Sequence, residues 1–390
     1  MRSRRVGLAL VALLFLGAGL AVRLPPYLGA AAFIARVGHV GGYPGAWAAR
    51  RASPVVVEPR REMPTRHGVV AIQDYHPTHD TTRTVLLVPG IHSMGIDEPR
   101  LTGLARDLAS AGLHVVAMAL PDLQRYRITP NATDVIEDAV LWLARQPTLA
   151  PDGRVGIVGI SFSGGLSIAA AGRPALAGRL AFVVSFGGHG DLPRVMRYLT
   201  TGEAPRVDGL TPRPPHDYGV AVILYGLADR VVPPDQVVTL RQGVETFLLA
   251  SQLTVAKRDE AEATFARART LADAMPEPSR TYMGYVNDRA VGKLGPVLEP
   301  YLGQLGTDSP ALSPARAERP PACAVFLLHG QDDTVIPAAE TSLLGAHLRE
   351  RGVRTRVLLS ALITHAELNR AVTVSDAWQL ISFWADILGR

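Results

Sequence analysis

Short apolar runs rich in valine and isoleucine recur along this chain, separated by longer stretches in which apolar residues return every three or four positions. The short runs predict buried strands, and the longer stretches predict helices that bury one face. Strands are predicted at 55–58, 69–75, 84–90, 114–119, 154–160, 181–186, 324–328 and 354–359. Because strands alternate with helices, we expect an α/β fold with a mostly parallel sheet and helices on both faces.

Proline, glycine and short polar residues mark the expected helix boundaries. After the strand at 84–90, Asp97 would cap a helix that has Pro99 in its first turn and stops at Gly112. Towards the C-terminus, a proline would open a helix over 338–350. Each of these helices would return the chain to the start of the next parallel strand.

The stretch between the strands at 181–186 and 324–328 is far longer than one helix and its loops require. Helices are predicted within it at 233–250, 259–274 and 286–305, followed by a linker rich in proline, alanine and arginine at 309–321. The chain therefore divides into a first core part, a helical insertion and a second core part, at 55–192, 193–320 and 321–390.

Residues 1–54 are expected to lie outside this fold, as a signal or membrane anchor and a linker. Three arginines among the first five residues precede a wholly apolar stretch at 6–22. This pattern is typical of a secretory signal or an uncleaved anchor, and the small residues at 19–21 would permit cleavage. A weaker apolar stretch at 27–40 would lie on the membrane surface, and the alternative for this N-terminal region is a buried helix of a soluble domain, which the arginine flank disfavours. The chain is predicted to be membrane-anchored or secreted, with its folded part outside the cytoplasm.

Composition narrows the classes of partner. The net charge of +5 is modest, and no basic stripe is interleaved with aromatic residues, so we expect no nucleic-acid partner. The single cysteine, Cys323, excludes an internal disulfide. No cysteine and histidine cluster has zinc-binding spacing, and His189 with Asp191 alone would not hold a metal, so neither a metal nor another cofactor is expected. The oligomeric state stays open.

One predicted strand ends at a candidate catalytic serine. The apolar run at 154–160 stops at Ser161, Gly159 lies two residues before that serine, and an alanine-rich helical segment follows. A strand, a tight turn with small residues and a helix predict a nucleophile elbow, although such a turn also serves packing or phosphate binding. Ser163 stands where glycine is usual, and as a nucleophile it would fit the pattern less well than Ser161.

Two further residues complete a catalytic triad. A serine hydroxyl needs an adjacent base, and a histidine base needs a carboxylate to orient it. Asp333 follows the strand at 324–328, and His365 follows the last strand. Both should reach the edge of the sheet where Ser161 lies, because the carboxyl ends of parallel strands share one edge.

With these residues in the order Ser161, Asp333, His365, the sequence resembles the α/β-hydrolase superfamily, in particular serine esterases and lipases with an inserted helical cap. The resemblance covers about 55–192 and 321–390. It implies that Ser161 is the nucleophile, Asp333 the acid and His365 the base, and that the insertion covers the active site.

The resemblance also implies an oxyanion hole made by the backbone amides of Ile91 and Phe162. It places the acid three residues before a Val/Ile-Pro pair, which favours Asp333 over Asp332. His92, beside the first of these amides, would either touch the substrate or form a hydrogen bond within its loop.

A second aspartate competes for the role of the acid. Asp229 begins another Asp-x-x-Val/Ile-Pro sequence, and the run at 220–227 before it fits either a strand or a buried helix. We prefer Asp333, because a strand–helix–strand unit connects it directly to His365. Otherwise Asp229 should start a helix with two prolines in its first turn.

These features predict a serine hydrolase that cleaves a small-molecule carboxylic ester through an acyl-enzyme intermediate, without a cofactor. The triad residues alone do not separate this from a peptidase or amidase on the same fold. A non-catalytic binding protein that keeps the scaffold is a further alternative, which the serine at position 163 favours. The acyl chain and the alcohol of the substrate stay open.

Overall fold

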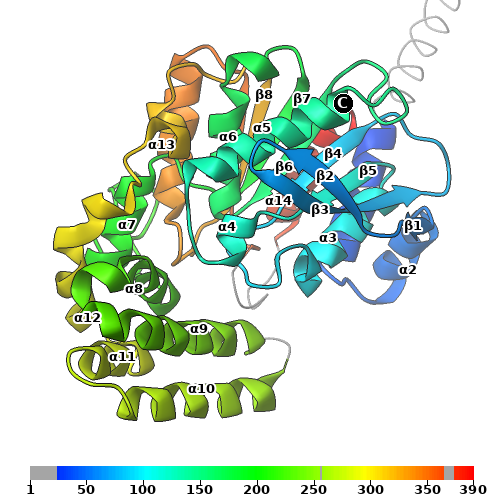
Figure 1. Cartoon of the computed structure of the whole chain (residues 1–390). Coiled ribbons are helices and arrows are strands. Elements are labelled where there is room, and N and C mark those ends of the chain that lie inside the picture. Colours follow the sequence, from blue (N-terminus) through cyan, green and yellow to red (C-terminus); the bar gives the residue numbers. More distant parts are fainter. Residues whose placement is uncertain (1–23, 255–256, 364–372) are drawn as a thin grey trace, which may run out of the picture.

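The computed structural model describes residues 24–254, 257–363 and 373–390 of the chain (Figure 1). Within them the strands form one nine-stranded sheet in the order β1-β3-β5-β4-β6-β7-β8-β9, with β2 paired to β3. The strands are β1 (Val55–Val57), β2 (Arg61–Thr65), β3 (Gly68–Pro77), β4 (Thr84–Val88), β5 (His114–Met118), β6 (Val155–Ile160), β7 (Leu180–Phe186), β8 (Ala324–Gly330) and β9 (Thr355–Ser360).

Strands β4 to β9 are parallel, and β1, β2 and β3 pair antiparallel at one end of the sheet. The predicted α/β fold with a mostly parallel sheet is confirmed. Each predicted strand is present, and β2 was not predicted. It lies off the main path, pairs with β3 alone and contains Pro64, so it lacks the apolar run of a buried strand.

Helices cover both faces of the sheet, because alternate strand residues point to opposite sides. Residues such as Leu86 and Ile157 join the core beneath α5 (Pro130–Ala144), α6 (Phe162–Ala171) and α13 (Ala338–Glu350). Residues such as Val85 and Val158 join the core on the other face, beneath α3 (Pro99–Ser110) and α14 (Val374–Leu388). The short α4 (Pro121–Gln124) connects β5 to α5.

One predicted helix cap was wrong. Glu98 caps α3, because its carboxylate accepts a hydrogen bond of 2.8 Å from the amide of Leu101. Asp97 instead ends a short 3₁₀ turn and pairs with the exposed Arg60 at 2.5 Å. Pro99 occupies the first turn of α3, as predicted.

The region before β1 is part of the fold, contrary to the expectation of a linker and a membrane-surface stretch. Residues 24–37 are helical and bury Ala30 and Phe33 in the core beneath α14. The ring of Phe33 lies 4.6 Å from that of Trp384, and α2 (Gly42–Arg50) follows. Among the described residues, no helix has the length and apolar character needed to cross a bilayer. The apolar stretch at 6–22 lies outside them.

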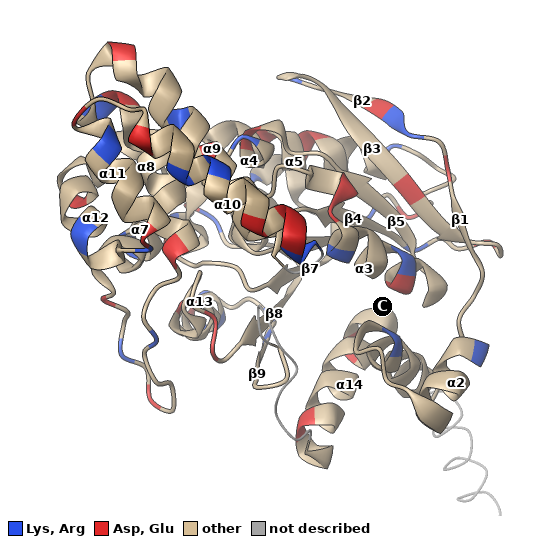
Figure 2. Cartoon of the chain, turned by 90° about the horizontal axis from the view of Figure 1, so that it is seen from below, with Lys and Arg blue, Asp and Glu red and all other residues tan. Residues whose placement is uncertain are grey.

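The insertion is helical, and it extends from the sheet as an arm in Figure 1. Its helices are α7 (Leu192–Thr201), α8 (Asp217–Val231), α9 (Val237–Leu253), α10 (Arg258–Asp273), α11 (Ser279–Asn287) and α12 (Val291–Leu298). The helix predicted over 286–305 is interrupted, since α11 ends and α12 begins within it and a 3₁₀ segment at Glu299–Leu305 completes it. Figure 2 shows acidic and basic residues mixed along these helices.

Candidate active site

The backbone turns sharply at Ser161, between β6 and α6. Its φ of 56° and ψ of −133° are strained for a residue with a side chain, and such strain is concentrated at functional sites. The amide of Ser161 donates a hydrogen bond of 2.7 Å to the carbonyl of Phe186 at the end of β7. A Cβ at Gly159 would lie 2.6 Å from the carbonyl oxygen of Ser163, so the turn requires glycine there. This is the geometry predicted for a nucleophile elbow.

Ser163 supports the elbow from within. It is fully buried, and its hydroxyl accepts a hydrogen bond of 2.9 Å from the amide of Ile160. The same hydroxyl lies 2.8 Å from each of the carbonyl oxygens of Ile160 and Val88, which share its single proton. The serine that stands in place of the usual glycine therefore links the elbow to the end of β4. Because Ser163 is buried, its hydroxyl is a poor candidate for the nucleophile.

The segment after β4 lies directly against the elbow. A Cβ at Gly90 would be 3.2 Å from the Cβ of Ser161. Ile91 follows Gly90, and Phe162 is the first residue of α6, where backbone amides have no partner within the helix. The structure thus brings the two residues predicted for the oxyanion hole to Ser161, and their role in binding an oxyanion stays a prediction.

Asp333 lies at the same edge of the sheet, in the loop after β8. It is 5% exposed, and its Oδ1 accepts hydrogen bonds from the amides of Val335 at 2.8 Å and Ile336 at 3.0 Å. Its Oδ2 would be 3.6 Å from a Cβ at Gly187, which directly follows Phe186. Since the carbonyl of Phe186 holds the amide of Ser161, only the end of β7 separates the carboxylate loop from the elbow.

His329, which the sequence analysis did not single out, holds this carboxylate. Its imidazole is fully buried, and Nε2 lies 2.9 Å from the carbonyl of Ile336 and 3.2 Å from Oδ2 of Asp333. A carbonyl oxygen only accepts, so Nε2 carries the proton and donates it to the carbonyl of Ile336, with Oδ2 of Asp333 close beside. Nδ1 then accepts from the hydroxyl of Thr341 at 2.7 Å. The signal in the sequence is a histidine within a buried strand, four residues before the acid.

His365 lies outside the described residues, and its role as the base stays a prediction. The described chain approaches the site just before it. A Cβ at Gly330, at the end of β8, would collide with the carbonyl oxygen of Ile363. The segment that leads to His365 therefore passes beside the loop that carries Asp333.

The structure separates the competing acids from the site. Asp332 is more exposed than Asp333 and pairs with Arg213 of the insertion at 2.6 Å. Asp229 lies in the last turn of α8, is exposed and pairs with Arg241 at 3.4 Å. The run at 220–227 is therefore helical, and the expectation that Asp229 would start a helix was wrong. Asp229 lies on an insertion helix, whereas a triad acid in this fold follows a strand of the sheet.

The insertion holds the acid loop from above. The hydroxyl of Tyr198 on α7 shares its proton between the carbonyls of Arg213 at 3.1 Å and Thr334 at 3.2 Å, and the amide of His216 donates to the Thr334 carbonyl at 2.8 Å. Burial, and then the neighbouring carboxylate of Asp333, raise the pKa of the Tyr198 hydroxyl. The position of the acid thus depends on the insertion as well as on β8.

The insertion also reaches the loop after β4. Gln252 on α9 accepts a hydrogen bond of 2.8 Å from the hydroxyl of Ser93, two residues beyond Ile91. Its amide donates to the hydroxyls of Tyr218 at 3.0 Å and Tyr126 at 3.3 Å. The insertion therefore contacts the loops on both sides of the elbow.

The other histidines and acids noted in the sequence have structural partners. Nδ1 of His92 accepts from the amide of Met94 at 3.2 Å, within its own loop. His189 is fully buried with Nε2 2.7 Å from the carbonyl of Leu312, and Asp191 caps α7. Across the described part of the chain, no group of three His, Cys, Asp or Glu side chains could hold a metal ion.

No protein-family model and no curated protein matches the chain. Among solved structures, it is similar to an esterase from Pyrobaculum calidifontis, with 16% identity, a TM-score of 0.45 and coverage of 87% of each chain. A brefeldin A esterase, described as a bacterial homologue of human hormone-sensitive lipase, shares 13% identity and a TM-score of 0.45 over 94% of this chain and 84% of its own. An acylaminoacyl peptidase from Pyrococcus horikoshii shares 11% identity and a TM-score of 0.42 over 88% of this chain and 42% of its own.

The fold is evident in the chain's own geometry. The six parallel strands β4 to β9, the antiparallel β3 beside β5, and a strained serine between β6 and α6 are arranged as the sequence resemblance implies. The acid loop follows β8 at the edge of the sheet where that serine lies. The chain has the α/β-hydrolase fold.

Proposed function

We propose that this protein is a serine hydrolase that cleaves a carboxylic ester of a small molecule. The observation that carries the proposal is the strained backbone of Ser161, held by Phe186, with the buried carboxylate of Asp333 one strand end away. Strain of this kind has a use where a hydroxyl must stand clear of the sheet and meet a base. A serine that only packed or capped a helix would need no such conformation.

In the proposed reaction, the hydroxyl of Ser161 attacks the ester carbonyl while His365 takes its proton. His365 then returns that proton to the leaving alcohol, and an acyl-enzyme remains. Water attacks the acyl-enzyme with His365 again as the base, which releases the carboxylic acid and restores the serine. Asp333 orients His365 and stabilises its charged form, and the amides of Ile91 and Phe162 bind the negative oxygen of each tetrahedral intermediate.

Hydrolysis of p-nitrophenyl esters by wild type, Ser161→Ala and Ser163→Ala tests the proposal. We expect Ser161→Ala to abolish turnover. Ser163→Ala should retain turnover with reduced stability, because the hydroxyl of Ser163 forms hydrogen bonds to the backbone of the elbow and of β4. Turnover that survives in Ser161→Ala contradicts the proposal. Aminoacyl amides in the same assay separate an esterase from a peptidase or amidase, and a wild type inactive on both substrates indicates a binding protein.

We further propose that residues 1–22 attach the protein to a membrane or direct its export, as their arginines and apolar run indicate. Cell fractionation with a C-terminal tag tests this. The folded part should be recovered in the membrane or outside the cytoplasm, and full-length protein in the cytoplasmic fraction contradicts it.

A further inference from the structure

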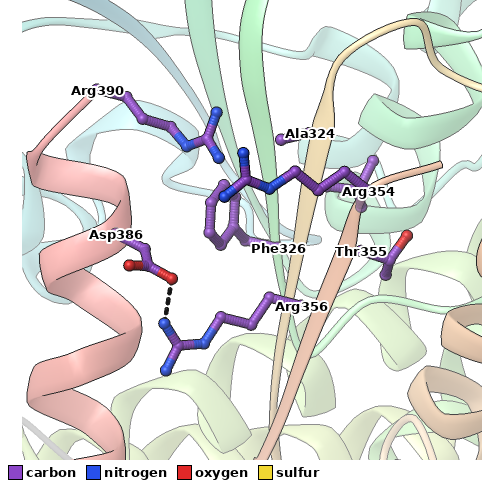
Figure 3. Close-up of a pocket in the computed structure, with 8 residues that line it drawn as sticks. Ala324, Phe326, Arg354, Thr355, Arg356, Asp386 and Arg390 are labelled. Carbon is purple, nitrogen blue, oxygen red and sulfur yellow. Dashed lines mark hydrogen bonds and ion pairs between the residues drawn. The ribbon is translucent and has the colours of Figure 1, made fainter.

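A cavity of about 170 Å³ lies at the amino edge of the sheet, between the first residues of β8 and β9 and the end of α14. Three arginines line it, namely Arg354, Arg356 and Arg390, together with one acid, Asp386 (Figure 3). The elbow and the acid loop lie at the opposite, carboxyl edge of the same strands. The cavity is therefore separate from the candidate active site.

Within the described part of the chain, one of the three arginines has a carboxylate partner. Arg356 pairs with Asp386, and its guanidinium also donates to the carbonyl of Ser382 at 3.0 Å. Among the described residues, no carboxylate forms an ion pair with Arg354 or with Arg390. With three arginines and one aspartate, the described lining of the cavity carries an excess of positive charge, although Asp386 also lies near enough to Arg390 to favour its charged form.

Two of these positive charges face each other. Figure 3 shows the guanidinium groups of Arg354 and Arg390 pointing towards one another beside the ring of Phe326. Arg390 lies over that ring at 5.2 Å from its centroid, which fixes the side chain although its residue is exposed. Burial, and then the neighbouring Arg354, lower the pKa of Arg390, although an arginine still stays charged in neutral solution.

The charge of Arg354 disfavours the charged form of Arg390, and an anion bound between the two guanidinium groups would offset this repulsion. Two guanidinium groups present several N–H donors, which match the oxygens of a phosphate group better than a single carboxylate. The volume of the cavity is several times the ~30 Å³ that one water occupies in the liquid. We propose that Arg354 and Arg390 form a binding site for a phosphate-type oxyanion, with Arg356 beside it.

The place of the cavity suggests two sources of such a group. Pro26 packs against Gly389, so the helix at 24–37 begins beside the arginine cavity. The sequence before that helix is the basic and apolar segment at 2–22. If this segment enters a bilayer, the cavity lies near the lipid headgroups. Inorganic phosphate and the headgroup of an anionic phospholipid share the chemistry that the two arginines recognise.

Binding is tested with the full-length chain and the variants Arg354→Gln and Arg390→Gln. Arg258→Gln is the matched control, because Arg258 is an exposed residue of α10 whose loss changes the net charge equally. In thermal unfolding at constant ionic strength, inorganic phosphate in place of chloride should stabilise wild type and the control. The apparent affinity should fall by at least about tenfold in each cavity variant.

Flotation with phosphatidylcholine vesicles, with and without phosphatidylglycerol, gives the second arm. A gain in binding from phosphatidylglycerol that Arg354→Gln and Arg390→Gln lose, and the control keeps, assigns the site to a headgroup. If Arg354→Gln and Arg390→Gln lose the stabilisation by phosphate but bind vesicles as wild type does, the site is assigned to free phosphate. Equal responses of all four proteins in both arms, or no response in either, overturn the proposal. Circular dichroism of each variant checks that it is folded.

Discussion

The imidazole of His329 lies 3.2 Å from the Oδ2 of Asp333, and both side chains are buried at the end of β8. The Nε2–H of His329 donates to the carbonyl of Ile336 beside this carboxylate, and Thr341 fixes the other ring nitrogen. We therefore infer that His329 helps to position Asp333, the proposed triad acid. A triad acid must be held in one orientation for the base to keep its productive geometry.

Replacing His329 tests this positioning role. We expect His329→Leu to lower kcat by roughly tenfold or more with little change in KM, because a buried acceptor then loses its donor. His329→Gln retains an N–H that can reach Asp333 and should keep more of the activity. Kinetics on folded protein, with the melting temperature measured in parallel, separate positioning from loss of stability. If kcat falls in proportion to the melting temperature in both variants, the positioning role of His329 is contradicted.

The choice of acid is tested by three substitutions of similar size. Asp333→Asn should lower kcat by about 10⁴-fold, the loss known when a triad acid becomes an amide. Asp332→Asn and Asp229→Asn should retain nearly full activity, because both carboxylates form ion pairs with arginines away from the elbow. Ester hydrolysis rates compare them directly. A larger loss in Asp229→Asn than in Asp333→Asn would reverse the assignment.

The elbow makes a prediction about stability. Gly159→Ala places a Cβ 2.6 Å from the carbonyl oxygen of Ser163, so it should lower the free energy of unfolding by about 1–3 kcal/mol and reduce activity. Gly103→Ala is the control, because a Cβ at Gly103 in α3 has no atom within 4 Å. That change should raise stability by about 0.5–1 kcal/mol through helix propensity. Urea unfolding of both variants measures the difference, and equal effects would contradict the close packing of the elbow.

Asp74 on β3 predicts a pH dependence of folding. Burial alone would raise the pKa of its carboxyl, but hydrogen bonds from His114 and Arg61 outweigh burial and lower it. A pKa lowered by folding contributes stability above the unfolded value of about 3.9, and that stability is lost as the pH falls through the folded value. Wild type should therefore exceed Asp74→Asn in melting temperature near neutral pH, and the difference should shrink below about pH 4. A difference independent of pH would contradict this linkage.

Much of the fold could be predicted because buried parallel strands leave continuous apolar runs in the sequence. The runs before Gly90 and Ser161 end where the structure ends β4 and β6, within two residues. The buried helix at 24–37 was the less favoured alternative, because an apolar face packed on α14 has the same pattern as one on a lipid surface. The nature of the 220–227 run needed the structure, since short apolar runs fit a strand and a buried helix equally.

The candidate site was predictable where it depends on local sequence. The elbow at Ser161 is local, since a strand, a small residue and a helix follow within a few positions. The roles of His329 and Ser163 depend instead on contacts across strands, which spacing does not reveal. The same holds for Tyr198 and Gln252, which link the insertion to the loops beside the elbow.

Covalent labelling tests the central claim most directly. A fluorophosphonate should modify wild type at the peptide that carries Ser161, and mass spectrometry of the digest identifies the modified residue. Ser161→Ala should show no adduct, and His365→Ala should be labelled far more slowly, because the hydroxyl then lacks its base. Labelling of wild type at any other serine, or labelling that is unchanged in both variants, contradicts the account.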